Sequence, residues 1–178
     1  MQTLSRPIAL VLSVGGAATA ILAVSAVTAP AMADSDVQES VTGHVDFVNT
    51  TSGNTIIYSL VAVRHADGTV SGEFEEKVYN AAGEFVRRTH GEHICLTITG
   101  NIARTGGVVT QSENSVPVGT EVFATLVDNG EGANDPADLA SPGGSGPPGS
   151  ALQHCTTGRP RPLFPIDRGN VQVHPSGR

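Results

Sequence analysis

Apolar and polar residues alternate along residues 41–174, and turn dipeptides interrupt the alternation at intervals of roughly 8 to 12 residues. A period of two places successive side chains on opposite faces of a strand, so each stretch predicts a strand with one buried face. Asp67-Gly68 is the clearest turn, because both central residues of such a hairpin need a positive φ. We find no helical periodicity in this part of the sequence. The pattern therefore predicts an all-β domain.

The predicted strands follow one another as hairpins, which is the order of an antiparallel meander. A short last strand at Val171–His174 can pair back to the first, and closure of this kind removes exposed edges. We expect a single small antiparallel β-barrel over residues 41–174, with a two-sheet β-sandwich as the alternative. Residues 34–40 are expected to be a disordered lead-in, residues 175–178 a tail, and the Gly/Pro-rich residues 129–151 a mobile loop.

The first 33 residues predict an export signal. Arg6 gives a positive start, an uncharged apolar stretch follows, and Ala31-Met32-Ala33 supplies the small residues that signal peptidase accepts. A membrane-spanning helix is the alternative, since about 20 apolar residues cross a bilayer. Gly15-Gly16 and the lack of a positive cluster after the apolar stretch favour a cleaved signal peptide. We therefore expect a secreted protein, extracellular or associated with the cell envelope.

The chain is acidic, with 17 Asp and Glu against 10 Lys and Arg and a formal net charge of −7. Nucleic acids and anionic membranes are bound through clustered Lys or Arg, so we expect neither partner. Cys95 and Cys155 both lie after the predicted cleavage site, and an even number of cysteines in an exported chain predicts a disulfide. The alternatives are metal ligation or a reactive thiol, which the absence of a Cys-x-x-Cys pair disfavours. A bridge across so long a loop adds about 4 kcal/mol in the chain-entropy model.

Two neighbouring predicted strands carry ionisable residues on one face. If Ile94 and the alternate residues after it point inward, the period of two places His90 and Glu92 inside as well. The same argument places Glu76 beside Phe74 on the inner face of the preceding strand. The two carboxylates and the imidazole could then meet in one cavity as a general acid–base site. The alternative is that the strand ends are solvated and that a bulge turns Glu76 outward.

An acidic loop with glycine bends spans residues 128–135. Its carboxylates, Asp128, Glu131 and Asp135, are candidate calcium ligands, because Ca²⁺ takes six to eight oxygen ligands and tolerates flexible loops. The string departs from the EF-hand order, and the alternative is a turn in which Asp128 caps its own backbone. We expect no other cofactor, since the six histidines are dispersed and form no recognisable zinc spacing.

Five strings distributed over the domain support a family resemblance. They are residues 90–92 (HGE) leading into 95–96 (CL), 99–103 (TGNIA), 106–109 (GGVV), 128–134 (DNGEGAN) and 167–173 (DRGNVQV). The sequence resembles a family of small, secreted, mostly actinobacterial β-rich proteins for which no activity is known. The resemblance covers residues 43–174 and implies a secreted bacterial β domain. Residues 141–150 form a longer Gly/Pro segment than the resemblance leads us to expect.

We recognise no complete catalytic set in the sequence. The first hypothesis is therefore a secreted, monomeric, non-enzymatic β domain that binds a small molecule or an extracellular protein. The second is a small-barrel enzyme of the lyase, cyclase or isomerase type that uses Glu76, His90 and Glu92. The third is a structural component of the envelope, which the acidic charge disfavours because it opposes self-assembly.

Overall fold

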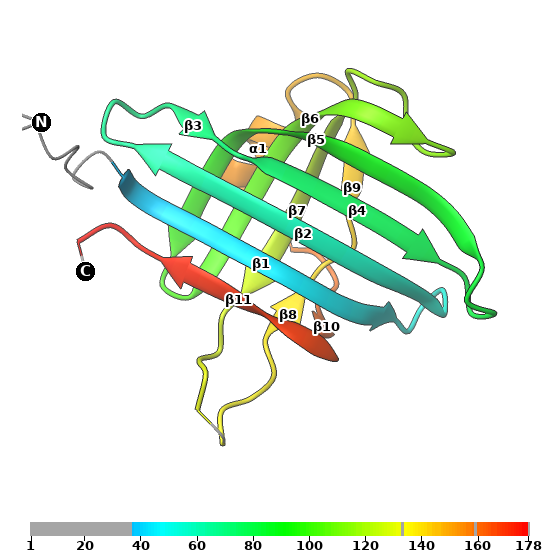
Figure 1. Cartoon of the computed structure of the whole chain (residues 1–178). Coiled ribbons are helices and arrows are strands. Elements are labelled where there is room, and N and C mark those ends of the chain that lie inside the picture. The colour runs from blue at the N-terminus through cyan, green and yellow to red at the C-terminus, as the bar shows by residue number, and fades with distance from the viewer. Residues whose placement is uncertain (1–36, 133, 159, 178) are drawn as a thin grey trace, which may run out of the picture. The chain divides into compact units, whose positions relative to one another are not determined.

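Antiparallel strands make up most of the computed structural model, which describes residues 37–132, 134–158 and 160–177. The described strands belong to one sheet, and a single short helix, α1 (Ser150–Thr157), lies outside it (Figure 1). The strands are β1 (Val37–Asn49), β2 (Asn54–His65), β3 (Val70–Ser71), β4 (Glu73–Tyr79), β5 (Phe85–Thr99), β6 (Ile102–Glu113), β7 (Glu121–Val127), β8 (Leu139–Ala140), β9 (Gly144–Gly146), β10 (Phe164–Pro165) and β11 (Arg168–His174). The predicted all-β class is confirmed.

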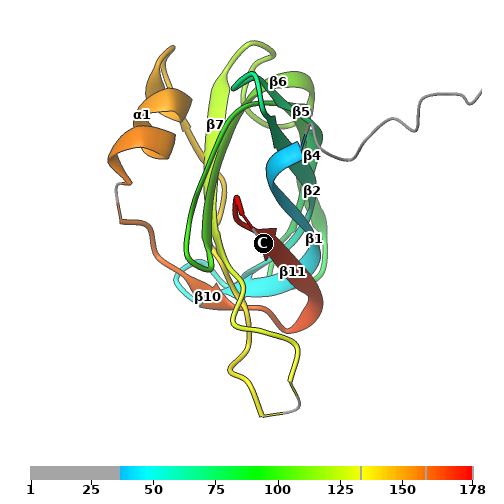
Figure 2. The ribbon, with the colours of Figure 1, turned by 90° about the vertical axis from the view of Figure 1, so that its left-hand side faces the viewer.

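The hydrogen-bonded strand order is β10-β8-β7-β6-β5-β4-β2-β1-β11, with β3 paired to β2 and β9 to β7. This order is open, yet its two ends belong to one segment, which we call the C-terminal strap (residues 164–174). Consecutive strap residues bind the two edges: the Ile166 N–H donates to the Asp138 carbonyl and the Asp167 N–H to the Asp46 carbonyl, both at 2.9 Å. The sheet curls into two facing layers (Figure 2). This open, sandwich-like arrangement corresponds to the alternative that the sequence left open, because no continuous ladder closes a barrel.

Two carboxylates occupy the edge of β11 that faces away from β1. The Val171 N–H donates to Asp138 Oδ2 at 3.0 Å, and the Val173 N–H donates to Asp128 Oδ2 at 2.9 Å. Asp138 also accepts from the Asn129 N–H at 2.7 Å, and its side chain is buried. Side chains that follow β7 and precede β8 therefore bind the strand edge where a closed barrel would have backbone pairs.

Inward side chains from both layers form one apolar core. β1 and β2 place alternate residues inside, as the period of two predicts. The largest fully buried apolar side chains are those of Phe47, Leu96 and Leu126. Phe47 stacks on Phe164 of the strap at 6.4 Å between ring centroids, so the core also holds the strap. Burying each such side chain contributes about 1.5–3 kcal/mol.

Three expectations about segments differ from the structure. Residues 37–40, which we placed in a disordered lead-in, form the start of β1. The Gly/Pro-rich segment 129–151 contains β8, β9 and the start of α1, with Ala140 buried, instead of being one long loop. α1 itself was not predicted, because eight residues give too few turns for a helical period. The predicted signal peptide, residues 1–33, lies outside the described residues.

A bulge in the middle of β5 reverses which residues point inward. β5 pairs His93 with Gly107 and Cys95 with Gly106 of β6, so Ile94 is an extra residue in the ladder. Just before the bulge the odd-numbered residues Thr89, Gly91 and His93 are buried, whereas after it the even-numbered Leu96 is buried. Ile94 is 46% exposed and does not point inward as expected.

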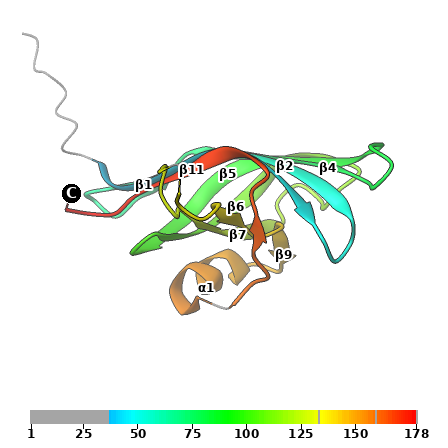
Figure 3. The same cartoon turned by 90° about the horizontal axis from the view of Figure 1, so that it is seen from below.

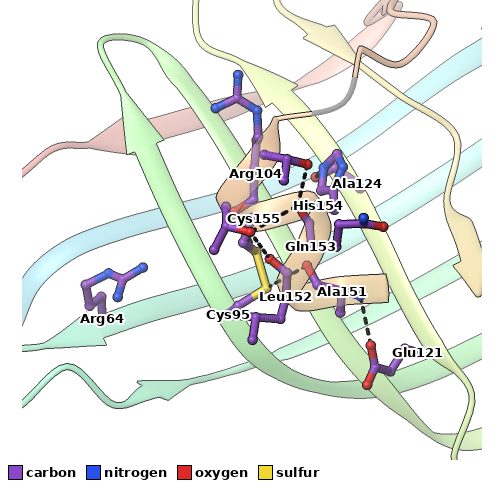
Figure 4. Close-up of a disulfide and its surroundings, with 12 residues drawn as sticks. Arg64, Cys95, Arg104, Glu121, Ala124, Ala151, Leu152, Gln153, His154 and Cys155 are labelled. Atoms are coloured by element: carbon purple, nitrogen blue, oxygen red, sulfur yellow. Dashed lines mark hydrogen bonds between the residues drawn. A yellow bond between two sulfur atoms is a disulfide. The ribbon is translucent and has the colours of Figure 1, made fainter. Parts of the chain in front are cut away.

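α1 packs on the outer face of β5, β6 and β7, away from the layer of β1, β2 and β4 (Figure 3). The predicted disulfide between Cys95 of β5 and Cys155 of α1 is confirmed (Figure 4). The Glu121 carboxylate of β7 accepts hydrogen bonds from the Gly149 and Ala151 N–H groups, at 2.9 and 2.8 Å. A negative charge at these free N–H groups stabilises the helix start.

Gly106 allows this close approach of helix and sheet. A Cβ atom on Gly106 would lie 2.7 Å from the Ala151 Cβ and 2.8 Å from the Cys95 Sγ. Both distances are shorter than van der Waals contact, so only glycine fits beneath the helix. The sequence showed Gly106-Gly107 as a bend, whereas the structure places Gly106 in β6 opposite the bulge of β5.

We predict that Asp138→Ala lowers the free energy of unfolding by about 2 to 4 kcal/mol, because two buried N–H groups lose a charged acceptor. Asp135→Ala is the control, since the exposed Asp135 carboxylate accepts, among the described residues, only the Gly132 N–H. Its effect is expected to stay below about 1 kcal/mol. Urea denaturation measures both losses, and faster amide exchange at Val171 locates the first. Equal losses in the two variants would contradict the role of Asp138.

We also predict that Gly106→Ala destabilises the domain by about 1 to 3 kcal/mol through the clash with Ala151. Ala151→Gly removes the clashing Cβ. The double variant should therefore lose less free energy of unfolding than the sum of the losses in the two single variants. Thermal unfolding of the four proteins in this cycle measures the coupling. Strictly additive losses would show that the clash is not the cause.

Candidate functional site

A cavity of about 440 Å³ lies between the two layers of the sheet. β2, β4 and β5 line one side of the cavity, and β7 and the segment around β9 line the other. Residues 114–116, in the connection between β6 and β7, complete the wall. The volume lies in the range of pockets that bind small organic molecules.

Glu76 is the buried charge of this cavity. It lies between Phe74 and Val78, and the strict alternation of β4 turns all three side chains inward. Its Oε1 accepts a hydrogen bond from Arg87 Nη2 at 2.9 Å, and its Oε2 accepts one from the Gly143 N–H at 3.0 Å. Only glycine allows the latter contact, since a Cβ on Gly143 would lie 2.7 Å from Glu76 Oε2. Both carboxylate oxygens are therefore engaged, as burial of a charge requires.

Tyr58 of β2 lies directly opposite Glu76 in the ladder. Burial raises the pKa of its hydroxyl above the usual range, and the negative charge of Glu76 raises it further. Tyr58 is 7% exposed, and the interaction of its hydroxyl with the neighbouring Thr105 hydroxyl opposes part of this rise in pKa. The protonated Tyr58 O–H is thus a donor available inside the molecule.

A hydroxyl pair fixes the loop at the cavity wall. Thr89 Oγ1 of β5 and Ser115 Oγ lie 2.7 Å apart, which ties the connection after β6 to the neighbouring strand. Asn114 precedes Ser115 with a φ of 53°, a left-handed conformation that asparagine tolerates better than most residues. This turn brings Val116 to the cavity wall.

The remaining wall is apolar. Phe74, Val122 and Phe123 line it. Two side chains hold the Phe123 ring: the His154 ring stacks on it at 5.0 Å between centroids, and the Arg161 guanidinium lies 5.1 Å from its centroid. Burial lowers the pKa of Arg161, and the Glu76 charge opposes that shift. The wall is therefore supported by packing from the helix side of the sheet.

The structure brings only one of the three predicted acid–base residues into the cavity. Glu76 points inward, as expected. His90 and Glu92 lie on the outer face, where they pair in register with Glu75 and Glu73. The expected inward placement of these two residues is wrong, because it extended the alternation back from Ile94 across the bulge. If the bulge is allowed for, the period of two places Arg87 on the inner face. No sequence feature indicated that the Tyr58 hydroxyl belongs to the site.

The three candidate calcium ligands bind other parts of the protein. Asp128 accepts from Gly130 and Val173 N–H groups, and Asp135 accepts from Gly132. Glu131 Oε1 accepts from the side-chain amides of Asn170 and Gln172, both at 2.8 Å. Among the residues that the structure describes, no group of three His, Cys, Asp or Glu side chains could hold a metal ion. The arrangement corresponds to the backbone-capping alternative.

His93 lies inside the domain, against the ring of Phe74 at 5.3 Å between centroids. It is 4% exposed, and neither ring nitrogen has a hydrogen-bond partner among the described residues. Burial lowers its pKa from 6.5 to about 4, while the Gly106 backbone has a smaller, opposite effect. His93 is therefore neutral in the folded protein at neutral pH.

We predict that the free energy of unfolding falls by about 3 kcal/mol through His93 as the pH is lowered from 6.5 to 4. In this window the unfolded chain binds a proton that the folded chain excludes. His93→Phe should make the free energy of unfolding depend less on pH in this window. His90→Phe, on the outer face, should leave that dependence unchanged. Urea denaturation at several pH values measures the slopes, and equal slopes in wild type and His93→Phe would contradict the assignment.

No protein-family model, curated protein or solved structure matches this chain. The resemblance to small secreted bacterial proteins therefore stays a prediction. Within the described ranges, no helix has the length and apolar character needed to cross a membrane. The case for a function accordingly rests on the geometry of the cavity.

Proposed function

We propose that this chain is a secreted, non-enzymatic β domain that binds a small organic molecule in the cavity around Tyr58, Glu76 and Arg87. One observation carries the proposal: a cavity of about 440 Å³ combines apolar walls with a buried ion pair and a buried tyrosine hydroxyl. Binding pockets combine these features, since apolar walls provide affinity and a few fixed polar groups orient the ligand.

The placement of the ionisable groups supports binding over catalysis. The alternative, a small-barrel enzyme, needs His90 and Glu92 in the cavity, and both lie on the outer face. Both oxygens of Glu76 already accept hydrogen bonds from groups of the protein, and these contacts fix the orientation of its carboxylate. A polar group that is fixed in this way orients a ligand.

The extracellular location is proposed on two features of the chain. The first 33 residues have the charge, apolar and small-residue regions of a signal peptide. The bridge between Cys95 and Cys155 is typical of proteins that fold in an oxidising compartment. Both agree with a small domain that meets its ligand outside the cell or at its surface.

We test binding with the neutral fluorophore 6-propionyl-2-(dimethylamino)naphthalene, whose emission shifts to the blue in an apolar site. The wild-type chain should bind one equivalent saturably. Val116→Trp adds a large side chain at the cavity wall, outside any strand, and should abolish binding. Glu76→Gln should weaken it about tenfold, because the loss of one charged hydrogen-bond partner releases Arg87.

Glu75→Gln is the matched control, since Glu75 makes an equivalent ion pair with Arg88 on the outer face of the same two strands. Its affinity for the fluorophore should equal that of the wild type. Binding that survives Val116→Trp unchanged, or no binding to the wild type, would refute the proposed function.

A further inference from the structure

The charges that line the cavity cancel. Among the described lining residues, Glu76 and Arg87 alone carry a formal charge, and they are paired at 2.9 Å. An anionic ligand would meet the Glu76 carboxylate, and a cationic ligand would meet the Arg87 guanidinium. Among the lining residues, neither ion would find an unpaired opposite charge to offset the cost of leaving water. The cavity therefore favours an uncharged ligand.

Hydrogen-bond donors exceed acceptors in the group formed by Tyr58, Glu76 and Arg87. The Tyr58 hydroxyl is protonated, and the Thr105 hydroxyl lies beside it. Arg87 uses one of its five N–H groups on Glu76, and the two oxygens of Glu76 are already occupied by Arg87 and Gly143. A buried donor without an acceptor is destabilising, so a bound molecule gains most by supplying an acceptor.

The walls around this donor suit a ring. Phe74, Val122 and Phe123 line the same cavity as Tyr58. The Phe123 ring packs against His154 and Arg161, and these contacts hold its orientation at the cavity wall. Aromatic faces of this kind add a specific preference for rings beyond the area that they bury.

On the basis of the proposed function, we infer that the ligand of this cavity is an uncharged, ring-containing molecule with a carbonyl or ether oxygen that accepts a hydrogen bond from Tyr58. Its apolar body lies against Phe74 and Val122, and its oxygen points toward the ion pair of Glu76 and Arg87. Tyr58 acts as a specificity-determining residue, because it distinguishes an oxygen acceptor from a hydrocarbon of equal size.

Four bicyclic probes of similar size test this inference by competition with the fluorophore on the full chain. 1-Tetralone carries a carbonyl, and tetralin is the same bicycle without a polar group. 1-Naphthoate and 1-naphthylmethylammonium carry a negative and a positive charge on a naphthalene ring system. We expect 1-tetralone to bind about threefold to tenfold more tightly than tetralin, which is the range of one neutral hydrogen bond. Both ions should bind more weakly than 1-tetralone.

Tyr58→Phe keeps the buried ring and removes the donor. In this variant 1-tetralone and tetralin should bind equally, while the affinity for tetralin stays within about twofold of the wild type. Tyr79→Phe is the control, because Tyr79 is the other tyrosine of the chain and packs against Phe85 at the end of β4. It should preserve the preference for 1-tetralone.

Failure of the ligand class is distinguishable from failure of the binding function. Equal binding of 1-tetralone and tetralin to the wild type, a preference that survives Tyr58→Phe, or an ion that binds best would overturn the inferred ligand class while the cavity still binds. No probe binding to the wild type, or binding that Val116→Trp leaves intact, would overturn the inference together with the proposed function.

Discussion

One C-terminal segment holds both edges of the sheet, and the other features of the domain depend on that constraint. β10 pairs with β8, and only two residues later β11 pairs with β1, so the strap fixes the distance between the two layers. Asp128 and Asp138 complete the connection by binding N–H groups along the second edge of β11. A sheet left open at this seam would expose a row of unpaired backbone groups, which promotes pairing with other chains.

The cavity is a consequence of how the layers meet at the other side of the sheet. Small residues bring the backbone of the segment before β9 to the Glu76 carboxylate, where a longer side chain at Gly143 would not fit. The ion pair with Arg87 then supplies the opposite charge that a buried carboxylate requires. Polar and apolar groups consequently coexist in one cavity, and the charges of its lining residues are balanced.

The sequence predicted the strands well because alternation depends on burial of one face, and the disulfide because export limits the chemistry of cysteines. Glu76 was found for the same reason, since β4 has no irregularity. The alternation gave the wrong face where a bulge changed the period. Ile94 adds one residue to β5, so His90 and Glu92 point outward. α1 escaped prediction because its eight residues are held by contacts distant in sequence, namely Cys95 and the Glu121 carboxylate. The pairing of Glu76 with Arg87 depends on the register between two strands, which a one-dimensional pattern leaves unspecified.

The position of the strap after the other described strands also has a kinetic consequence. The hairpins of β1 to β7 can form early, because those contacts are local. The pairing of β1 with β11 spans most of the domain's sequence, and such long-range pairing is the slow part of β-sheet folding. Docking of the strap therefore completes the sheet, and until it occurs the first strand keeps one unpaired edge.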